Sequence, residues 1–71
     1  MWQANRSLSL REKQVWRLLS QGKSNREIAE ELQLSMATVK TYLRRLYSKL
    51  GVASRAEAAR VFGEMSSKRM T

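Results

Sequence analysis

The sequence predicts an all-α fold, a small four-helix bundle, from three observations. Proline is absent and only three glycines occur in 71 residues, which leaves little material for anything but short connections between helices. Serine–glutamate pairs stand where helices would begin, and leucine and valine recur behind them at helical spacing. A chain of this size forms one domain, which buries only about 60% of the surface of its unfolded form.

Capping residues place the helices. In a capping box the serine hydroxyl accepts the backbone N–H three residues later, and the glutamate accepts the serine N–H. Boxes are predicted at Ser9–Glu12, Ser24–Glu27 and Ser54–Glu57, with Ser35 as a fourth N-cap. Gly22 and Gly51 are expected in the left-handed conformation that ends helices. The predicted helices are therefore about 9–20, 25–32, 36–50 and 55–65. A folded domain is expected over 8–65, between flexible polar tails at 1–7 and 66–71.

Apolar side chains give each helix a side that faces the core. Helix 9–20 offers Leu10, Val15, Leu18 and Leu19, with Trp16 at the edge; helix 25–32 offers Ile28, Ala29 and Leu32; helix 36–50 offers Val39, Leu43, Leu46 and Leu50. Helix 55–65 carries two apolar lines, Ala58–Val61–Met65 and Ala59–Phe62. A core needs only one line, so the second is a candidate surface for self-association or for another protein.

The charge favours a polyanionic partner. The net charge is +8, and half of it lies in residues 35–50, which hold Lys40, Arg44, Arg45 and Lys49 and no acidic residue. Cysteine and histidine are absent, so no metal or cofactor site is expected and an enzyme is the least favoured class. The longest apolar stretches fall far below the ~18 residues that a transmembrane helix needs. The exposed face of helix 36–50 is small and polar, whereas helices that bind a membrane surface need bulky apolar groups, so no membrane partner is expected.

The side of helix 36–50 opposite its leucines is a candidate surface for reading DNA. The side chains there lie about 100–200° around the helix from Val39, and they are Ala37, Lys40, Thr41, Arg44 and Ser48. Lysine and arginine donate to guanine O6 and N7, and threonine meets a base edge or a thymine methyl. A basic helix face is more often merely solvated, but a short helix, the tight turn "LQLS" and this longer basic helix form a helix-turn-helix. In that motif the second helix enters the major groove.

Phosphate contacts are expected beside this surface. Thr38, Arg45 and Lys49 lie at about 240–280° on the same wheel, where the groove walls would be. The N–H groups at helix starts bind phosphate, which adds Ser24–Asn25 and Ser35.

The segment "LSLREKQVWRLLSQGKSNREIAEELQLSMATVKTYLRRLYSKLGVASRAEA" resembles the LuxR/GerE-type DNA-binding domain of bacterial transcription regulators. The resemblance covers about residues 8–61 and rests on "LSLRE", "G-x-SN-x-EIA", "LS-x-x-TVKTYL" and "KLGV-x-SR" in order. It implies that helix 36–50 is the recognition helix and that helix 55–65 is the dimer contact. Tyr42 departs from the family pattern, which often has histidine there, and its role stays open.

The resemblance also implies individual roles. Base contacts are expected from Lys40, Thr41 and Arg44. Backbone contacts are expected from Ser24, Asn25, Arg26, Thr38 and Lys49, beside Ser35 and Arg45 from the geometry above. The dimer interface is expected at Ala58, Ala59, Phe62 and Met65. Glu12 and Arg55 also occupy family positions, and we expect them to pair and to hold helix 9–20 against the start of helix 55–65.

Together these features predict a sequence-specific regulator of transcription that binds double-stranded DNA as a homodimer on two half-sites, in the bacterial cytoplasm at the nucleoid. RNA polymerase is a further expected partner. Members of the family usually carry an N-terminal receiver or ligand-binding domain, so a free-standing small regulator and an excised domain both stay open. The alternative function is an adaptor or antagonist that binds another regulator through helix 55–65.

Overall fold

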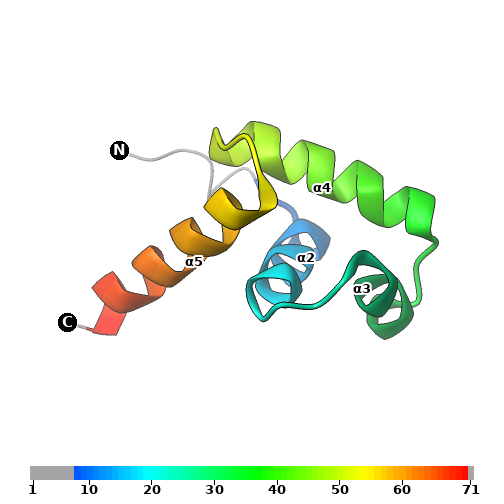
Figure 1. Ribbon diagram of the computed structural model, residues 1–71, viewed down its shortest axis with the longest axis horizontal. Coiled ribbons are helices and arrows are strands. Elements are labelled where there is room, and N and C mark those ends of the chain that lie inside the picture. The colour runs from blue at the N-terminus through cyan, green and yellow to red at the C-terminus, as the bar shows by residue number, and fades with distance from the viewer. Residues whose placement is uncertain (1–7, 71) are drawn as a thin grey trace.

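The computed structural model describes the backbone of residues 8–70 and the side chains of residues 8–65, and in that range all regular structure is helical (Figure 1). The helices are α2 (Leu10–Ser20), α3 (Asn25–Leu32), α4 (Met36–Leu50) and α5 (Arg55–Met70). The prediction of an all-α four-helix fold is confirmed. The tail predicted at 1–7 lies outside the described residues. α5 continues to Met70 rather than ending near residue 65, because neither glycine nor proline follows Gly63 to stop it.

The predicted helix starts are confirmed, with one shifted bond. Ser9 and Ser24 form complete capping boxes with Glu12 and Glu27. The backbone N–H of Ser24 is the main reason that the pKa of the Glu27 carboxyl lies below its ordinary value. The third box is incomplete: Ser54 Oγ accepts Glu57 N–H at 3.2 Å, but Glu57 Oε1 accepts the N–H of Ala53, one residue before the serine, at 2.8 Å.

The turns take left-handed backbone where the chain reverses. Gly22 and Gly51 have φ of +88° and +71°, as expected of glycines at helix ends. Gln33, which ends α3, also has positive φ, 58°. The sequence contains no signal for this, since the turn between α3 and α4 uses a side-chain-bearing residue where glycine is commonest.

The core is built around α2, which contacts all three other helices. In Figure 1, α4 runs along the top of the molecule above α2, α3 lies to the right of α2, and α5 lies to its left. Val15 of α2, Ile28 of α3, and Val39 and Leu46 of α4 are fully buried between the helices. Within the described part of the chain, no helix is long and apolar enough to cross a bilayer.

Two predictions about the core are wrong in detail. Leu10 is 74% exposed, and Leu8 is buried in its place. Leu10 is the first residue of α2 and lies about 140° from Val15 and about 180° from Leu19 around the helix, so it cannot share their side. Leu8 precedes the helix, and the non-helical backbone at Ser9 lets it reach the core.

Trp16 is central rather than at the edge of the core. It is 3% exposed, and its Nε1–H donates to the backbone carbonyl of Ala58 at 2.8 Å. Its ring packs edge-on against Phe62, with the ring centroids 5.2 Å apart. Trp16 therefore joins α2 to α5 by apolar packing and by a buried hydrogen bond that satisfies its only polar atom.

Candidate nucleic-acid interface

The exposed stripe of α4 has the geometry that the helical wheel predicts. Val39, Leu43, Leu46 and Leu50 are buried beneath the helix. On the opposite side Ala37, Lys40, Arg44 and Ser48 are exposed and Thr41 is half-exposed. The base-contact candidates Lys40, Thr41 and Arg44 thus lie on one open face, on consecutive turns of a regular helix. These two cations and one hydroxyl, with small side chains between them, can enter a polar groove that is wide enough for a helix.

Thr41 is held in one orientation on this face. Its Oγ1–H donates to the backbone carbonyl of Ala37 at 3.1 Å, one turn earlier. With that hydrogen used inside the helix, the hydroxyl offers lone pairs and the side chain offers its methyl group. Thr41 can therefore accept from a base amino group or touch a thymine methyl.

The N-terminus of α4 is organised by its cap. Ser35 Oγ accepts the N–H of Thr38 at 3.1 Å and donates to Thr38 Oγ1 at 2.9 Å. Met36, the first residue of the helix, is 43% exposed. The sequence pattern predicts no role for Met36.

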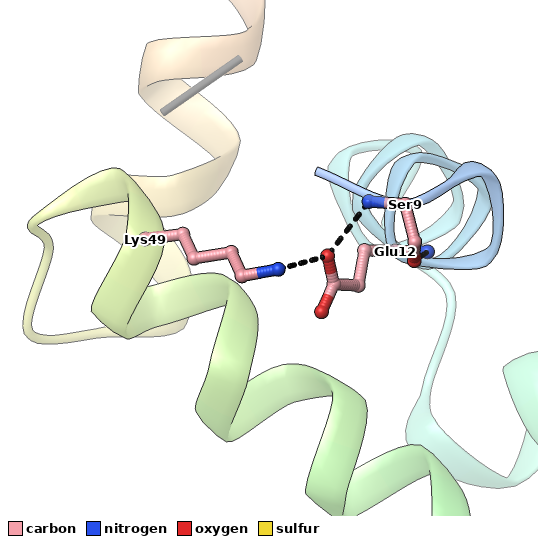
Figure 2. Close-up of polar contacts among 3 residues, drawn as sticks. All are labelled: Ser9, Glu12 and Lys49. Carbon is pink, nitrogen blue, oxygen red and sulfur yellow. Dashed lines mark hydrogen bonds and ion pairs between the residues drawn. The ribbon is translucent and has the colours of Figure 1, made fainter. Parts of the chain in front are cut away.

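Lys49, predicted to contact the DNA backbone, already has a partner within the chain. Its Nζ donates to Glu12 Oε1 at 2.9 Å, so α4 is tied to the first turn of α2 (Figure 2). Glu12 Oε1 also accepts the backbone N–H of Ser9 at 2.8 Å. The expected Glu12–Arg55 pair is wrong, because the end of α4 brings Lys49 to this carboxylate. A phosphate contact by Lys49 stays a prediction, and the free protein uses its ammonium for structure.

The electrostatics of Glu12 follow from these contacts. Its side chain is 2% exposed, and burial by itself raises the pKa of the carboxyl. The hydrogen bond from Lys49, the Ser9 backbone N–H and the attraction of the Lys49 charge outweigh burial, so the pKa lies below its ordinary value. Glu12 is therefore a buried, ionised carboxylate at neutral pH, and its Oε1 accepts from both Ser9 and Lys49.

The start of α3 is held by α5. Arg55, the first residue of α5, donates from Nη1 to Asn25 Oδ1 at 2.8 Å and from Nη2 to the backbone carbonyl of Lys23. Ser24 and Asn25, two predicted backbone contacts, thus lie in a segment that is fixed from both sides: by the capping box within α3 and by Arg55 from outside. Arg26 is exposed beside them. Arg55 lies 30 positions from Asn25 in the sequence, and no local pattern of the sequence identifies the contact.

The predicted dimer surface is only partly available. Ala58 is fully buried, and its carbonyl accepts from Trp16, so its place in that surface is a wrong prediction. Phe62 also packs on Trp16, and both apolar lines of α5 contribute to the core. Helix α5 therefore has no second apolar line that lies wholly outside the core, although the sequence suggests one. Ala59, Phe62 and Met65 keep part of their surface exposed.

Nothing in the described residues suggests a metal site, since no three His, Cys, Asp or Glu side chains gather there. Buried side-chain nitrogen and oxygen atoms in the same range all have hydrogen-bond partners.

Comparison with known proteins identifies a family that this chain matches. Residues 6–62 match the family described as "Bacterial regulatory proteins, luxR family". The chain is similar to the "HTH-type transcriptional regulator MalT" of Yersinia pestis and of Yersinia pseudotuberculosis (strain YPIII). It is 53% identical to each over 51 residues, which are 72% of this chain and 6% of the relative. The chain thus spans a small fraction of the length of these relatives.

Proposed function

Because the chain belongs to the luxR family of bacterial regulatory proteins, we propose that it reads specific double-stranded DNA sequences as a dimer, through the exposed stripe of α4. The family assignment makes the chain a helix-turn-helix DNA-binding domain of a transcription regulator, and domains of this family are not enzymes. The base contacts, the backbone contacts and the dimeric arrangement are the proposal.

The observation that carries it is the α4 surface. The exposed stripe bears Lys40, Thr41 and Arg44 without an acidic neighbour on the same helix, while the buried side of α4 is wholly apolar. Lys40 and Arg44 supply donors for guanine, and Thr41 supplies an acceptor and a methyl group. Each good bidentate base contact discriminates by about 1–3 kcal/mol. α4 would enter the major groove with these three side chains toward the base edges.

Affinity would come mainly from phosphate contacts. We assign these to residues at the starts of α3 and α4 and along one flank of α4, namely Ser24, Asn25, Arg26, Ser35, Thr38, Arg45 and Lys49. Neutralising phosphates releases counterions, so binding would weaken steeply as salt rises.

The dimer would form through the exposed parts of Ala59, Phe62 and Met65 on α5. Because Ala58 is fully buried and Phe62 packs partly against Trp16, the remaining area is small. We therefore expect dimers only on DNA that carries two half-sites. The same packing weakens the alternative of an adaptor that binds another regulator through α5, since that proposal needs a free apolar line. The bacterial cytoplasm, at the nucleoid, and a contact with RNA polymerase belong to the same proposal.

The test is selection from a pool of randomised duplexes at about 0.15 M salt, close to physiological ionic strength. Enrichment of a motif with two related half-sites supports the whole proposal. Retention without enrichment leaves a non-specific binder and removes the base contacts. No retention overturns DNA binding by this chain and leaves the adaptor as the better reading.

A further inference from the structure

Arg55 bridges two helices that have different tasks in the proposed function. It begins α5, yet both hydrogen bonds of its guanidinium reach the start of α3, to Asn25 Oδ1 and to the carbonyl of Lys23. The side chain is half-buried, which reduces the competition from water for these bonds. A bidentate guanidinium fixes direction as well as distance, because its donors lie in one rigid plane.

This contact decides which end of the Asn25 amide faces outward. A guanidinium has donors and no acceptor, so the amide must turn its oxygen toward Arg55. The Nδ2 group, with two hydrogens to donate, is then directed away from Arg55. Among the described residues no acceptor for Nδ2 is found, and Asn25 is partly exposed. A phosphate group offers acceptors only, so it matches the end of the amide that Arg55 leaves open.

We propose that Arg55 is a positioning residue for DNA binding: it orients the Asn25 amide as a donor to a DNA phosphate and holds the 23–25 turn in the geometry that this contact needs. The proposal rests on the proposed function. It makes the phosphate contact of α3 depend on the docked first turn of α5, so α5 contributes to DNA binding without touching the duplex at Arg55. The proposal predicts that substitutions at Arg55 and Asn25 have coupled, non-additive effects on DNA affinity. A direct phosphate contact by Arg55, or a role of Arg55 in stability alone, would not produce this coupling.

The experiment is a double-mutant cycle on DNA affinity, measured over a range of salt concentrations at a temperature where every variant is folded. The variants are Asn25→Ala, Arg55→Lys, Arg55→Gln and each Arg55 variant combined with Asn25→Ala. Arg60→Gln is the matched control, since Arg60 is an exposed arginine on the same helix. Each single change at Asn25 or Arg55 is expected to weaken binding about tenfold, the value of one lost charge-assisted hydrogen bond. The double variants are expected to be no weaker than the single ones.

Salt separates positioning from direct contact. Losing one cation–phosphate contact lowers the slope of log affinity against log salt by about 0.9. Arg55→Gln is expected to keep the wild-type slope. Arg55→Lys, which keeps the charge but not the planar fork, is expected to weaken binding as Arg55→Gln does. In NMR spectra the Nδ2 signals of Asn25 should shift on addition of the duplex in the wild type and not in Arg55→Gln.

Other results overturn the proposal. Additive effects in the cycle, a slope reduced by about 0.9 in Arg55→Gln, or an Arg55→Gln variant equal to Arg60→Gln would each remove the positioning role while DNA binding stands. A wild-type chain that binds no duplex removes the proposed function and this inference together. The two failures are thus told apart by the wild-type measurement.

Discussion

The Nζ of Lys49 at the end of α4 lies 2.9 Å from the Oε1 of Glu12 in the first turn of α2 (Figure 2). The same carboxylate oxygen accepts the N–H of Ser9, so one buried group closes the cap of α2 and anchors α4. The placement of α4, the candidate recognition helix, against α2 is thus set partly by Lys49. The sequence predicts a phosphate contact for this residue.

Replacing Lys49 should therefore lower stability as well as any DNA affinity. Lys49→Met keeps the aliphatic stem but leaves the Glu12 carboxylate buried without its cation. We expect a loss of about 1–3 kcal/mol in the free energy of unfolding, at the low end for a buried charge because the Lys49 side chain is 34% exposed and water can enter. Urea denaturation at pH 7 measures it. Arg45→Met, an exposed cation on the same helix, is the control and should change stability by less than about 0.5 kcal/mol. Equal effects of the two variants contradict the prediction.

The stability of the chain should fall in acid partly through Glu12. Its pKa is lower in the folded chain than in the unfolded one, where it is near the ordinary 4.5. Such a group stabilises the fold at pH values above 4.5, and this contribution is lost as pH falls through the lower, folded-state pKa. Glu12→Gln should be less stable than the wild type at pH 7 and should lose less stability as the pH falls from about 5 to about 3, because the folded-state pKa of the Glu12 carboxyl lies below 4.5.

Thermal unfolding at several pH values checks this. Glu64→Gln, an exposed carboxyl on α5, is the matched control and should follow the wild-type curve. If the stability of Glu12→Gln changes with pH in the same way as that of the wild type does, ionisation of Glu12 does not contribute to the loss of stability in acid.

Arg44 and Arg45 should affect DNA binding in different ways although they are neighbours in sequence. Arg44 lies in the middle of the exposed stripe and is proposed to read a base, whereas Arg45 lies about 100° around the helix, toward the proposed phosphate flank. Arg44→Ala should flatten base preference at one or two positions of each half-site. Arg45→Ala should weaken binding to all sequences about equally and lower the salt slope by about 0.9.

Selection with randomised duplexes, repeated on each variant, separates the two patterns. Arg45 is a cleaner backbone comparator than Lys49, because replacing Lys49 also removes the partner of Glu12. The assignment of the two arginines is wrong if their patterns are exchanged.

The same substitution at two glycines should have opposite effects on stability. Gly51 ends α4 with φ of +71°, and Gly63 lies within α5. A Cβ added at either position meets no atom within 4 Å, so sterics between side chains play no part. Gly51→Ala should destabilise by about 1–2 kcal/mol, the cost of left-handed backbone. Gly63→Ala should stabilise by about 0.5–1 kcal/mol, through helix propensity. Urea denaturation of both variants tests this, and effects of the same sign contradict it.

The sequence alone determined the local structure and the exposed face of α4. Caps at Ser9, Ser24 and Ser35 and the glycine at Gly51 act within a few residues of themselves, so their effect can be read from neighbours in the chain. The α4 stripe follows from helical period alone, because one buried side defines the opposite one. The end of α5 was missed since it depends on the absence of a stop signal rather than on the presence of one.

Only the tertiary structure decided which side chains meet across the bundle. Helical period states which side of a helix is apolar, but it does not state how far along the neighbouring helix a given residue lies. The positions of the helices along one another therefore decide that Glu12 pairs with Lys49 rather than with Arg55, and that Arg55 contacts the start of α3. The packing of α5 on α2 also buries Ala58, whose carbonyl accepts from Trp16, and so removes Ala58 from the predicted dimer surface. Contacts between residues 30 to 42 positions apart depend on the packing of whole helices, and packing is a property of the folded chain rather than of any segment of it.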